Sequence, residues 1–164
     1  MSITTTTHLN LPGTARAALA FYQSVFGGQV LATTYGDLGM PAGTPGADRI
    51  VFGQLENESG FRLMAYDIPG LDPDRADHAD HAGHAGHAGT TTRAHGLTHT
   101  DRAFFQSVRG TSLAEVQVCW DGLSDGAEVI EPLAASAWSA GFGMLTDRYG
   151  VTWVLDVQPP AENG

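Results

Sequence analysis

The clearest alternation of hydrophobic and polar residues lies near the C-terminal end of the chain. Two apolar runs, residues 142 to 146 and residues 151 to 157, are separated by the polar segment Asp147-Arg148-Tyr149-Gly150. Gly150 tolerates a positive φ angle, so the chain can reverse direction there. In the second run, two sets of residues alternate with the period of two that gives a strand two different faces. This pattern predicts a β-hairpin with one face against a helix and the other against a cavity or solvent.

The N-terminal part of the chain has the pattern of one helix and four strands. Residues 4 to 11 alternate between polar and apolar side chains, which suits a half-buried strand. Thr14 stands where it can cap a helix over residues 15 to 26, whose apolar residues have helical spacing and which ends at Gly27-Gly28. Further strands are expected at residues 29 to 35, 49 to 55 and 61 to 67. The predicted order is β-α-β-β-β.

The same order returns after residue 100. Residues 104 to 109 are expected to form a strand, and Ser112 with Glu115 forms a capping box that opens a helix ending near Leu123. We expect the buried stripe of this helix to consist of Leu113, Val116, Trp120 and Leu123. A strand at residues 128 to 133 and the hairpin at residues 142 to 157 complete a second β-α-β-β-β series.

Short matches between the two series indicate an internal duplication. Leu11-Pro-Gly-Thr14 matches Val108-Arg-Gly-Thr111 at a shift of 97, and Gly27-Gly-Gln-Val30 matches Gly126-Ala-Glu-Val129 at a shift of 99. We therefore predict an α+β fold of two βαβββ modules, residues 1 to 69 and residues 101 to 158. Their strands would form a curved mixed sheet around a cleft, with the helices on the outer face. Residues 159 to 164 are expected to be a C-terminal tail.

Residues 70 to 100 interrupt this pattern. They contain few bulky apolar residues and six of the seven histidines of the chain, so we expect a mobile insert that cannot bury enough surface to order itself. Four histidines, His78, His81, His84 and His87, recur every three residues. In a polyproline II strand they would stand about 9 Å apart, too far for neighbours to share one ion. A flexible segment could still wrap a metal ion adventitiously, although expansion of a His-Ala-Gly repeat explains the pattern more simply.

Charge and cysteine content narrow the range of partners and compartments. The net charge is −10, with eight arginines and no lysine, so phosphate backbones and anionic membranes are poor partners. The chain has one cysteine, Cys119, which excludes an internal disulfide, and the chain starts without the pattern of a secretory signal. We expect a protein of the cytoplasm that does not bind nucleic acid or membranes.

Several segments resemble a known family. The chain is similar to the glyoxalase, bleomycin-resistance and extradiol-dioxygenase superfamily, also called vicinal oxygen chelate, and most resembles its PhnB-like branch. The segments that carry the resemblance are residues 9–11, 18–28, 63–67 and 132–133, Trp138 and above all residues 142–153. The resemblance implies paired βαβββ modules around a cleft. It does not imply one activity, because isomerases, dioxygenases, lyases and simple binding proteins share this scaffold.

The resemblance also implies where a metal ion would be bound. Metal-dependent members carry ligands on the first and last strands of each module, usually His and Glu, and His8 stands at the first of these positions. The corresponding point of the second module falls at about Phe105, and the usual glutamate position of the last strand holds Val154. The equivalent strand of the first module offers residues 63 to 65, Leu-Met-Ala. One histidine cannot hold a divalent ion, so we predict no metal centre in the cleft of a single chain and no cofactor.

Strand parity and residue chemistry suggest which side chains line the cavity. His8 is the candidate catalytic residue, either as a proton acceptor, as a vestigial ligand or simply as a polar residue of the cavity wall. Arg62 and Tyr66 share a strand face and could bind an anionic ligand, and Trp138 could close over a pocket. The residues expected on the cavity faces are Asn10, Arg62, Tyr66, Phe105, Ser107, Trp138, Thr152 and Asp156.

The leading functional hypothesis is a metal-free protein that binds a small molecule, and the family resemblance implies a homodimer. One alternative is a metal-dependent lyase, isomerase or dioxygenase whose missing ligands come from a partner chain or from the histidine-rich insert. A further alternative is metal buffering by that insert alone. The identity of the ligand depends on the shape of the cleft, which the sequence does not reveal.

Overall fold

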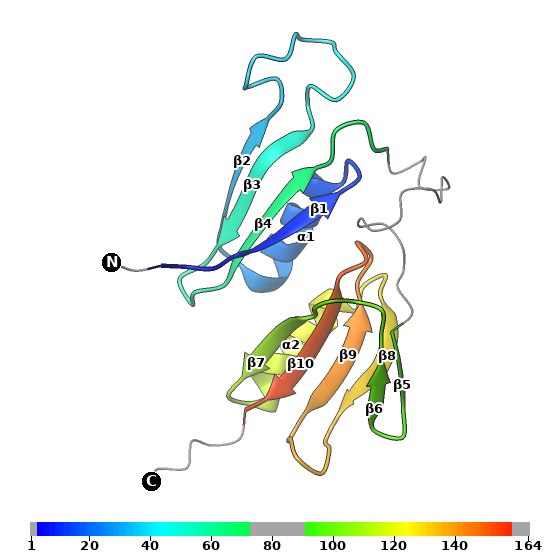
Figure 1. The fold of residues 1–164 in the computed structure, drawn as a ribbon. Coiled ribbons are helices and arrows are strands. Elements are labelled where there is room, and N and C mark those ends of the chain that lie inside the picture. Colours follow the sequence, from blue (N-terminus) through cyan, green and yellow to red (C-terminus); the bar gives the residue numbers. More distant parts are fainter. Residues whose placement is uncertain (1–2, 73–90, 159–164) are drawn as a thin grey trace. The chain divides into compact units, whose positions relative to one another are not determined.

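The computed structural model describes residues 3–72 and 91–158, which form two compact units (Figure 1). The elements of the first unit are β1 (Thr7–Leu11), α1 (Ala15–Phe26), β2 (Gln29–Thr34), β3 (Ile50–Glu56) and β4 (Arg62–Asp67). The elements of the second unit are β5 (Thr92–Ala94), β6 (Leu97–His99), β7 (Gln106–Gly110), α2 (Leu113–Leu123), β8 (Glu128–Ala134), β9 (Phe142–Thr146) and β10 (Thr152–Val157). Both predicted β-α-β-β-β series are therefore present.

Each series forms a four-stranded mixed sheet of the same topology. The strand orders are β1-β4-β3-β2 and β7-β10-β9-β8, and in each sheet the first strand pairs in parallel with the last strand of its series. The other neighbouring pairs are antiparallel. This arrangement confirms the predicted α+β fold of two βαβββ modules.

One helix covers one face of each sheet, and two glycines permit its close approach (Figure 1). A Cβ atom on Gly53 of β3 would lie 2.4 Å from Cδ1 of Leu19 in α1. A Cβ atom on Gly143 of β9 would lie 2.6 Å from the ring of Trp120 in α2. Because both distances are shorter than a normal contact, a side chain at either position would force the side chain of Leu19 or Trp120 to move.

The hairpin turns of the two modules are the same structure, which supports the inferred duplication. The Asn57 amide donates to the Phe61 carbonyl, and Gly60 donates to the Asn57 carbonyl. The turn from Asp147 to Val151 repeats both hydrogen bonds with Gly150 at the place of Gly60. Gly53 and Gly143 are separated by the same 90 positions. The second hairpin is thus a copy of the first, shifted by 90 residues.

The two helices begin with different caps, and one of these differs from the prediction. The Ser112–Glu115 capping box of α2 is confirmed. Thr14 precedes α1 as predicted, but its side chain makes no capping hydrogen bond. Instead, Asp67 at the end of β4 accepts a hydrogen bond from the Ala15 amide at 2.8 Å and another from the Ile50 amide at 2.8 Å. A carboxylate distant in sequence therefore ties the start of α1 to the start of β3.

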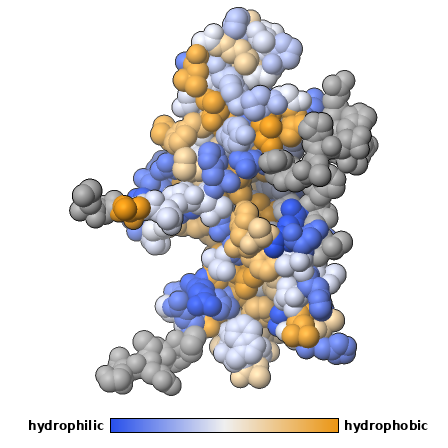
Figure 2. All heavy atoms as spheres, in the orientation of Figure 1, coloured by the Kyte–Doolittle hydropathy of each residue, from blue (hydrophilic) through white to orange (hydrophobic). Residues whose placement is uncertain are grey.

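The cores follow most of the predicted apolar positions. Trp153 is 1% exposed, and Val116 and Leu123 of α2 are fully buried. Leu113 was expected in the buried stripe of α2, but it is 45% exposed because it lies in the first turn of the helix, where the stripe begins. Trp120 is only half-buried. The surface in Figure 2 correspondingly mixes hydrophobic and hydrophilic residues.

Part of the predicted mobile insert is ordered. Residues 92–99 form the β5–β6 hairpin, whose turn residues His95 and Gly96 both have positive φ angles of 52° and 77°. Two positive φ angles are typical of the two-residue turn that best matches the twist of a hairpin. The hairpin is stabilised by contacts with the second module, which composition alone did not reveal.

Other predictions concern parts of the chain outside the described residues. The four regularly spaced histidines and the C-terminal tail lie there, and the predicted module boundaries stay a prediction. None of the helices in residues 3–72 and 91–158 is long and apolar enough to cross a bilayer.

Replacing Asp67 is expected to destabilise the first unit. Asp67 is 2% exposed, so Asp67→Ala would leave two buried amides without acceptors and lower the free energy of unfolding by about 2–5 kcal/mol. Urea unfolding followed by circular dichroism measures this loss, and amide hydrogen exchange should accelerate at Ala15 and Ile50. Asp48→Asn, at an exposed aspartate, is the control. Equal stability of the two variants would contradict the role of Asp67.

The capping box of α2 is expected to make stability depend on pH. Hydrogen bonds from Thr111, and then from Ser112, hold the pKa of Glu115 below its ordinary value. The folded state therefore gains stability above the ordinary glutamate range and loses it as the pH falls through the lowered pKa. Glu115→Gln should lower the melting temperature at pH 7, with a difference that shrinks in acid. The fluorescence of the three tryptophans, all in the second unit, reports the transition. An undiminished difference in acid would contradict this account, and Glu58→Gln is the control.

Candidate functional site

The uncovered face of the first sheet brings three predicted residues together. His8 and Asn10 of β1 point away from the core, whereas the intervening Leu9 is buried. Asn10 pairs in register with Tyr66 of β4, and the rings of His8 and Tyr66 meet edge to face with centroids 5.5 Å apart. An imidazole, an amide and a phenol therefore lie close together on the face opposite α1.

Arg62 lies on the same face of β4 but is engaged elsewhere. Its Nε atom is 3.4 Å from Oε2 of Glu56 on β3, and Gln54 donates to the same carboxylate oxygen at 3.0 Å. Both side chains of the ion pair are nearly half exposed, so the pair contributes little to stability. Arg62 is available to an anionic ligand only in competition with Glu56.

The uncovered face of the second sheet contains a buried carboxylate. Asp156 of β10 is 6% exposed and pairs in register with Arg109 of β7 and Phe142 of β9. Arg109 Nε lies 3.1 Å from Asp156 Oδ1 and forms an ion pair with it, although this oxygen accepts no hydrogen bond from the described residues. Oδ1 of Asp156 can therefore still accept a hydrogen bond from another donor.

The β5–β6 hairpin covers another part of this face. The Cζ atom of Arg93 lies 4.6 Å from the centre of the Phe142 ring, and Arg93 also contacts Glu131 at 3.5 Å and Thr98 at 2.8 Å. The ring of Trp138 meets Phe142 edge to face at 4.8 Å and is 56% exposed. Trp138, which the sequence suggested could close over a pocket, is thus an exposed ring packed against Phe142.

The remaining predicted residues play smaller parts. The Thr152 hydroxyl lies 3.0 Å from the Thr146 hydroxyl, and Thr152 is 5% exposed, so its polar group is already used. Ser107 is exposed on β7 opposite Val154. Phe105 is half-buried and precedes β7. Of these three residues, Ser107 presents the most accessible polar group.

Sequence reasoning missed Phe142, Arg109, Arg93 and Glu131. Phe142 could have been found, because the period of two along the predicted hairpin places it on the face of Asp156. Arg109 follows from the parallel pairing of β7 with β10. The role of Arg93 could not be predicted from the sequence. This residue lies in a segment of low complexity, and its contact with Glu131 joins elements that are far apart in the sequence.

The register of the sheets corrects one position in the predicted metal-ligand scheme. His8 pairs with Met64, and the residue that follows Met64 by 90 positions, Val154, pairs with Ser107. The strand pairing therefore makes Ser107, rather than Phe105, the counterpart of His8. Neither pair by itself, the imidazole and thioether of the first module or the hydroxyl and aliphatic side chain of the second, supplies the three or four donors that a divalent ion requires. Residues 3–72 and 91–158 also contain no cluster of three metal-binding side chains.

The single cysteine lies outside these faces. Burial, and secondarily the charge of Glu115, raises the pKa of the Cys119 thiol. The thiol is consequently less ionised at neutral pH than an ordinary cysteine, and the thiolate is the reactive form. Cys119 of α2 therefore has the environment of a structural cysteine.

Solved structures of similar fold cover nearly the whole chain. Protein PA1353 from Pseudomonas aeruginosa is 28% identical, with a TM-score of 0.69 over 96% of this chain and 98% of that protein. The PhnB protein from Bacillus cereus is 21% identical, with a TM-score of 0.63 over 95% of this chain and 100% of its own. A glyoxalase/bleomycin resistance protein/dioxygenase from Nocardioides is 19% identical, with a TM-score of 0.52 over 100% of this chain and 92% of its own. No curated protein matches the sequence.

A family model matches residues 8–155, which include both β-α-β-β-β series. This range extends from the first strand of the first module into the last strand of the second. The chain therefore belongs to the glyoxalase/bleomycin resistance protein/dioxygenase superfamily.

Proposed function

We propose that this chain is a metal-free, small-molecule-binding protein of the PhnB-like type, which uses the uncovered faces of its sheets to bind an organic ligand. The observation that carries the proposal is the chemistry of these faces. They present hydrogen-bonding and aromatic side chains, while the positions that hold metal ligands in related enzymes carry His8, Met64, Ser107 and Val154. Such faces suit an organic molecule better than a divalent ion.

The buried carboxylate of Asp156 indicates that the ligand carries a hydrogen-bond donor. The Oδ1 atom of Asp156 lies 3.1 Å from Arg109 Nε but accepts no hydrogen bond from the described residues, so it can accept one from a ligand. The matching group of the ligand is an N–H or O–H donor. The exposed Trp138 ring, held by Phe142, offers a flat apolar surface for the body of such a ligand.

His8 is better explained as a residue of a binding site than as a catalytic residue. A catalytic histidine usually has a partner that orients its ring, and among the described residues Tyr66 supplies only an edge-to-face ring contact. The resemblance of the sequence to PhnB-like proteins supports the assignment to that type, and a PhnB protein shares the fold over 95% of this chain. The homodimer and the cytoplasmic location stay predictions that rest on the family resemblance and on composition.

Metal analysis tests the proposal against both metal-dependent alternatives. Tag-free protein should contain less than one equivalent of any transition metal after dialysis, measured by plasma mass spectrometry. A variant with His78, His81, His84 and His87 changed to Gln should lose any weakly held ions, which would assign them to the histidine row. One tightly bound ion that survives these substitutions but is lost in His8→Ala would overturn the metal-free proposal in favour of an enzyme.

A thermal-shift screen of metabolites tests ligand binding itself. A ligand present at about 100 times its dissociation constant adds about 2.7 kcal/mol to the free energy of unfolding, which raises the melting temperature by several degrees. The shift should persist in EDTA and should decrease in Asp156→Asn and Trp138→Leu, both in the second unit, but not in Arg16→Gln on the exposed side of α1. Ligands whose effect requires added metal, or is unchanged in both site variants, would contradict the proposal.

A further inference from the structure

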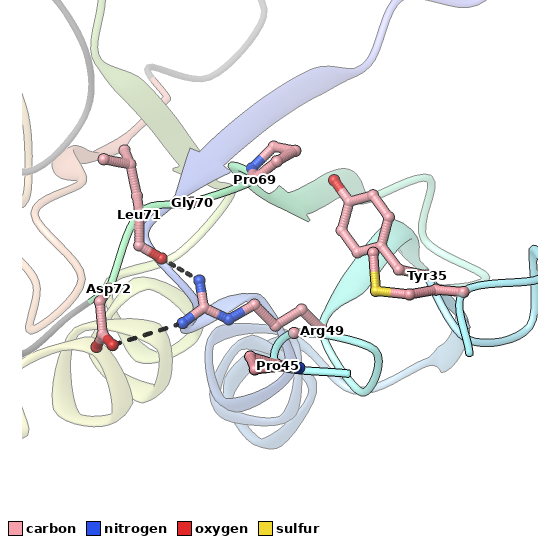
Figure 3. A pocket seen from close by; sticks show the side chains of 9 residues that line it. Tyr35, Pro45, Arg49, Pro69, Gly70, Leu71 and Asp72 are labelled. Carbon is pink, nitrogen blue, oxygen red and sulfur yellow. Dashed lines mark hydrogen bonds and ion pairs between the residues drawn. The ribbon is translucent and has the colours of Figure 1, made fainter. Parts of the chain in front are cut away.

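A separate pocket in the first unit has walls from two segments that follow strands. Figure 3 shows it between the β2–β3 loop and the residues after β4. Its volume is about 250 Å³, and it is lined by Tyr35, Met40, Pro45, Gly46, Arg49, Pro69, Gly70, Leu71 and Asp72. None of these residues belongs to the sheet faces discussed for the proposed function. The pocket therefore constitutes an independent candidate site.

Hydrogen bonds hold the walls of the pocket in place. The Tyr35 hydroxyl donates to the carbonyl of Asp67 at 3.0 Å, which fixes the phenol ring against the end of β4. The Tyr35 amide donates to the Arg49 carbonyl at 3.0 Å, and the Gly36 amide donates to the Ala47 carbonyl at 2.7 Å, so the two ends of the loop are joined. A pocket with walls fixed in this way does not lose much conformational entropy when a ligand binds.

Arg49 supplies the positive charge of the pocket. Its side chain is only 24% exposed, and Nη1 donates to the carbonyl of Leu71. Nη2 lies 3.9 Å from Oδ2 of Asp72, which is longer than a direct charge-assisted hydrogen bond, and the Asp72 side chain is 46% exposed. A guanidinium group has five N–H donors, and Leu71 and Asp72 are its partners in the described part of the chain. Most of this donor capacity remains for a ligand.

We propose that this pocket binds a small organic monocarboxylate, with the carboxylate on Arg49 and an apolar body against Tyr35 and the prolines. A planar guanidinium matches a carboxylate through two parallel hydrogen bonds of about 2.7–2.9 Å, which are stronger than the loose contact with Asp72. The ligand carboxylate therefore takes the place of Asp72 beside Arg49. Pro45, Pro69 and Leu71 supply the apolar contacts.

Size and charge limit the class of ligand. A cavity of about 150 Å³ accommodates benzene, so the volume of about 250 Å³ suits a ring or a short chain that carries one carboxylate. A dianion such as a phosphate monoester is less suitable, because Arg49 is the one cation among the lining residues and Asp72 is already negative. A neutral molecule would leave the Arg49 donors unused.

Titration with matched probes tests this site. Benzoate, hexanoate and the neutral analogue benzamide are added to the full chain, and amide chemical shifts of residues 35–49 and 69–72 are followed by NMR. We expect both carboxylates to shift these resonances and benzamide to bind at least about tenfold more weakly, a difference of about 1.4 kcal/mol. If neither carboxylate shifts them up to about 20 mM, a range that includes millimolar binding, the proposal is wrong.

Two substitutions in the pocket should have opposite effects. Arg49→Gln should weaken benzoate binding at least about tenfold, whereas Asp72→Asn should strengthen it because the competing carboxylate is removed. Arg148→Gln, at an arginine of the second unit that does not line the pocket, should leave the affinity unchanged. Weaker binding in Asp72→Asn, or equal affinity for benzoate and benzamide, would overturn the assignment even if Arg49→Gln failed to fold.

A further variant separates this site from the proposed function. Asp156 and Tyr66 do not line the pocket, so Asp156→Asn should not alter benzoate binding.

Discussion

The central constraint in this protein is that each four-stranded sheet has a single helix, and a single helix buries only one of the two faces. Leu19 in α1 and Trp120 in α2 pack over glycines of their sheets, which brings each helix close and makes the covered face a core. The opposite face must then be met by solvent, by a ligand or by another part of the chain. Function in this fold follows from what meets that face.

The two modules have diverged in how they treat the uncovered face. In the first module, His8, Asn10 and Tyr66 remain accessible there. In the second module, Arg93 from the β5–β6 hairpin lies over Phe142. The turns and the glycines under the helices are shared by both modules, so the structural framework has been kept while the side chains on these faces have changed.

Much of the fold and part of the candidate site could be predicted from the sequence. Alternation along β1 placed His8 and Asn10 on one face of the strand, and both residues are exposed while Leu9 between them is buried. The sequence comparison assigned Phe105 as the counterpart of His8, because it aligned the short segments that precede the two helices. The pairing of the strands, which the sequence does not show, identifies Ser107 instead. The pocket around Arg49 was missed, since its walls belong to loops for which periodicity makes no prediction.

The sequence by itself determined the helices and strands of the two βαβββ series, their order and the capping box of α2, because these depend on residues within a few positions of one another. Only the tertiary structure decided that Asp67 caps a helix 52 residues away, that Arg93 packs on Phe142, and that Arg49 faces a pocket. Hydrophobic periodicity records which side of an element is buried. It does not record which distant group meets that side, because that choice depends on the free energy of contacts formed only when the whole unit is folded.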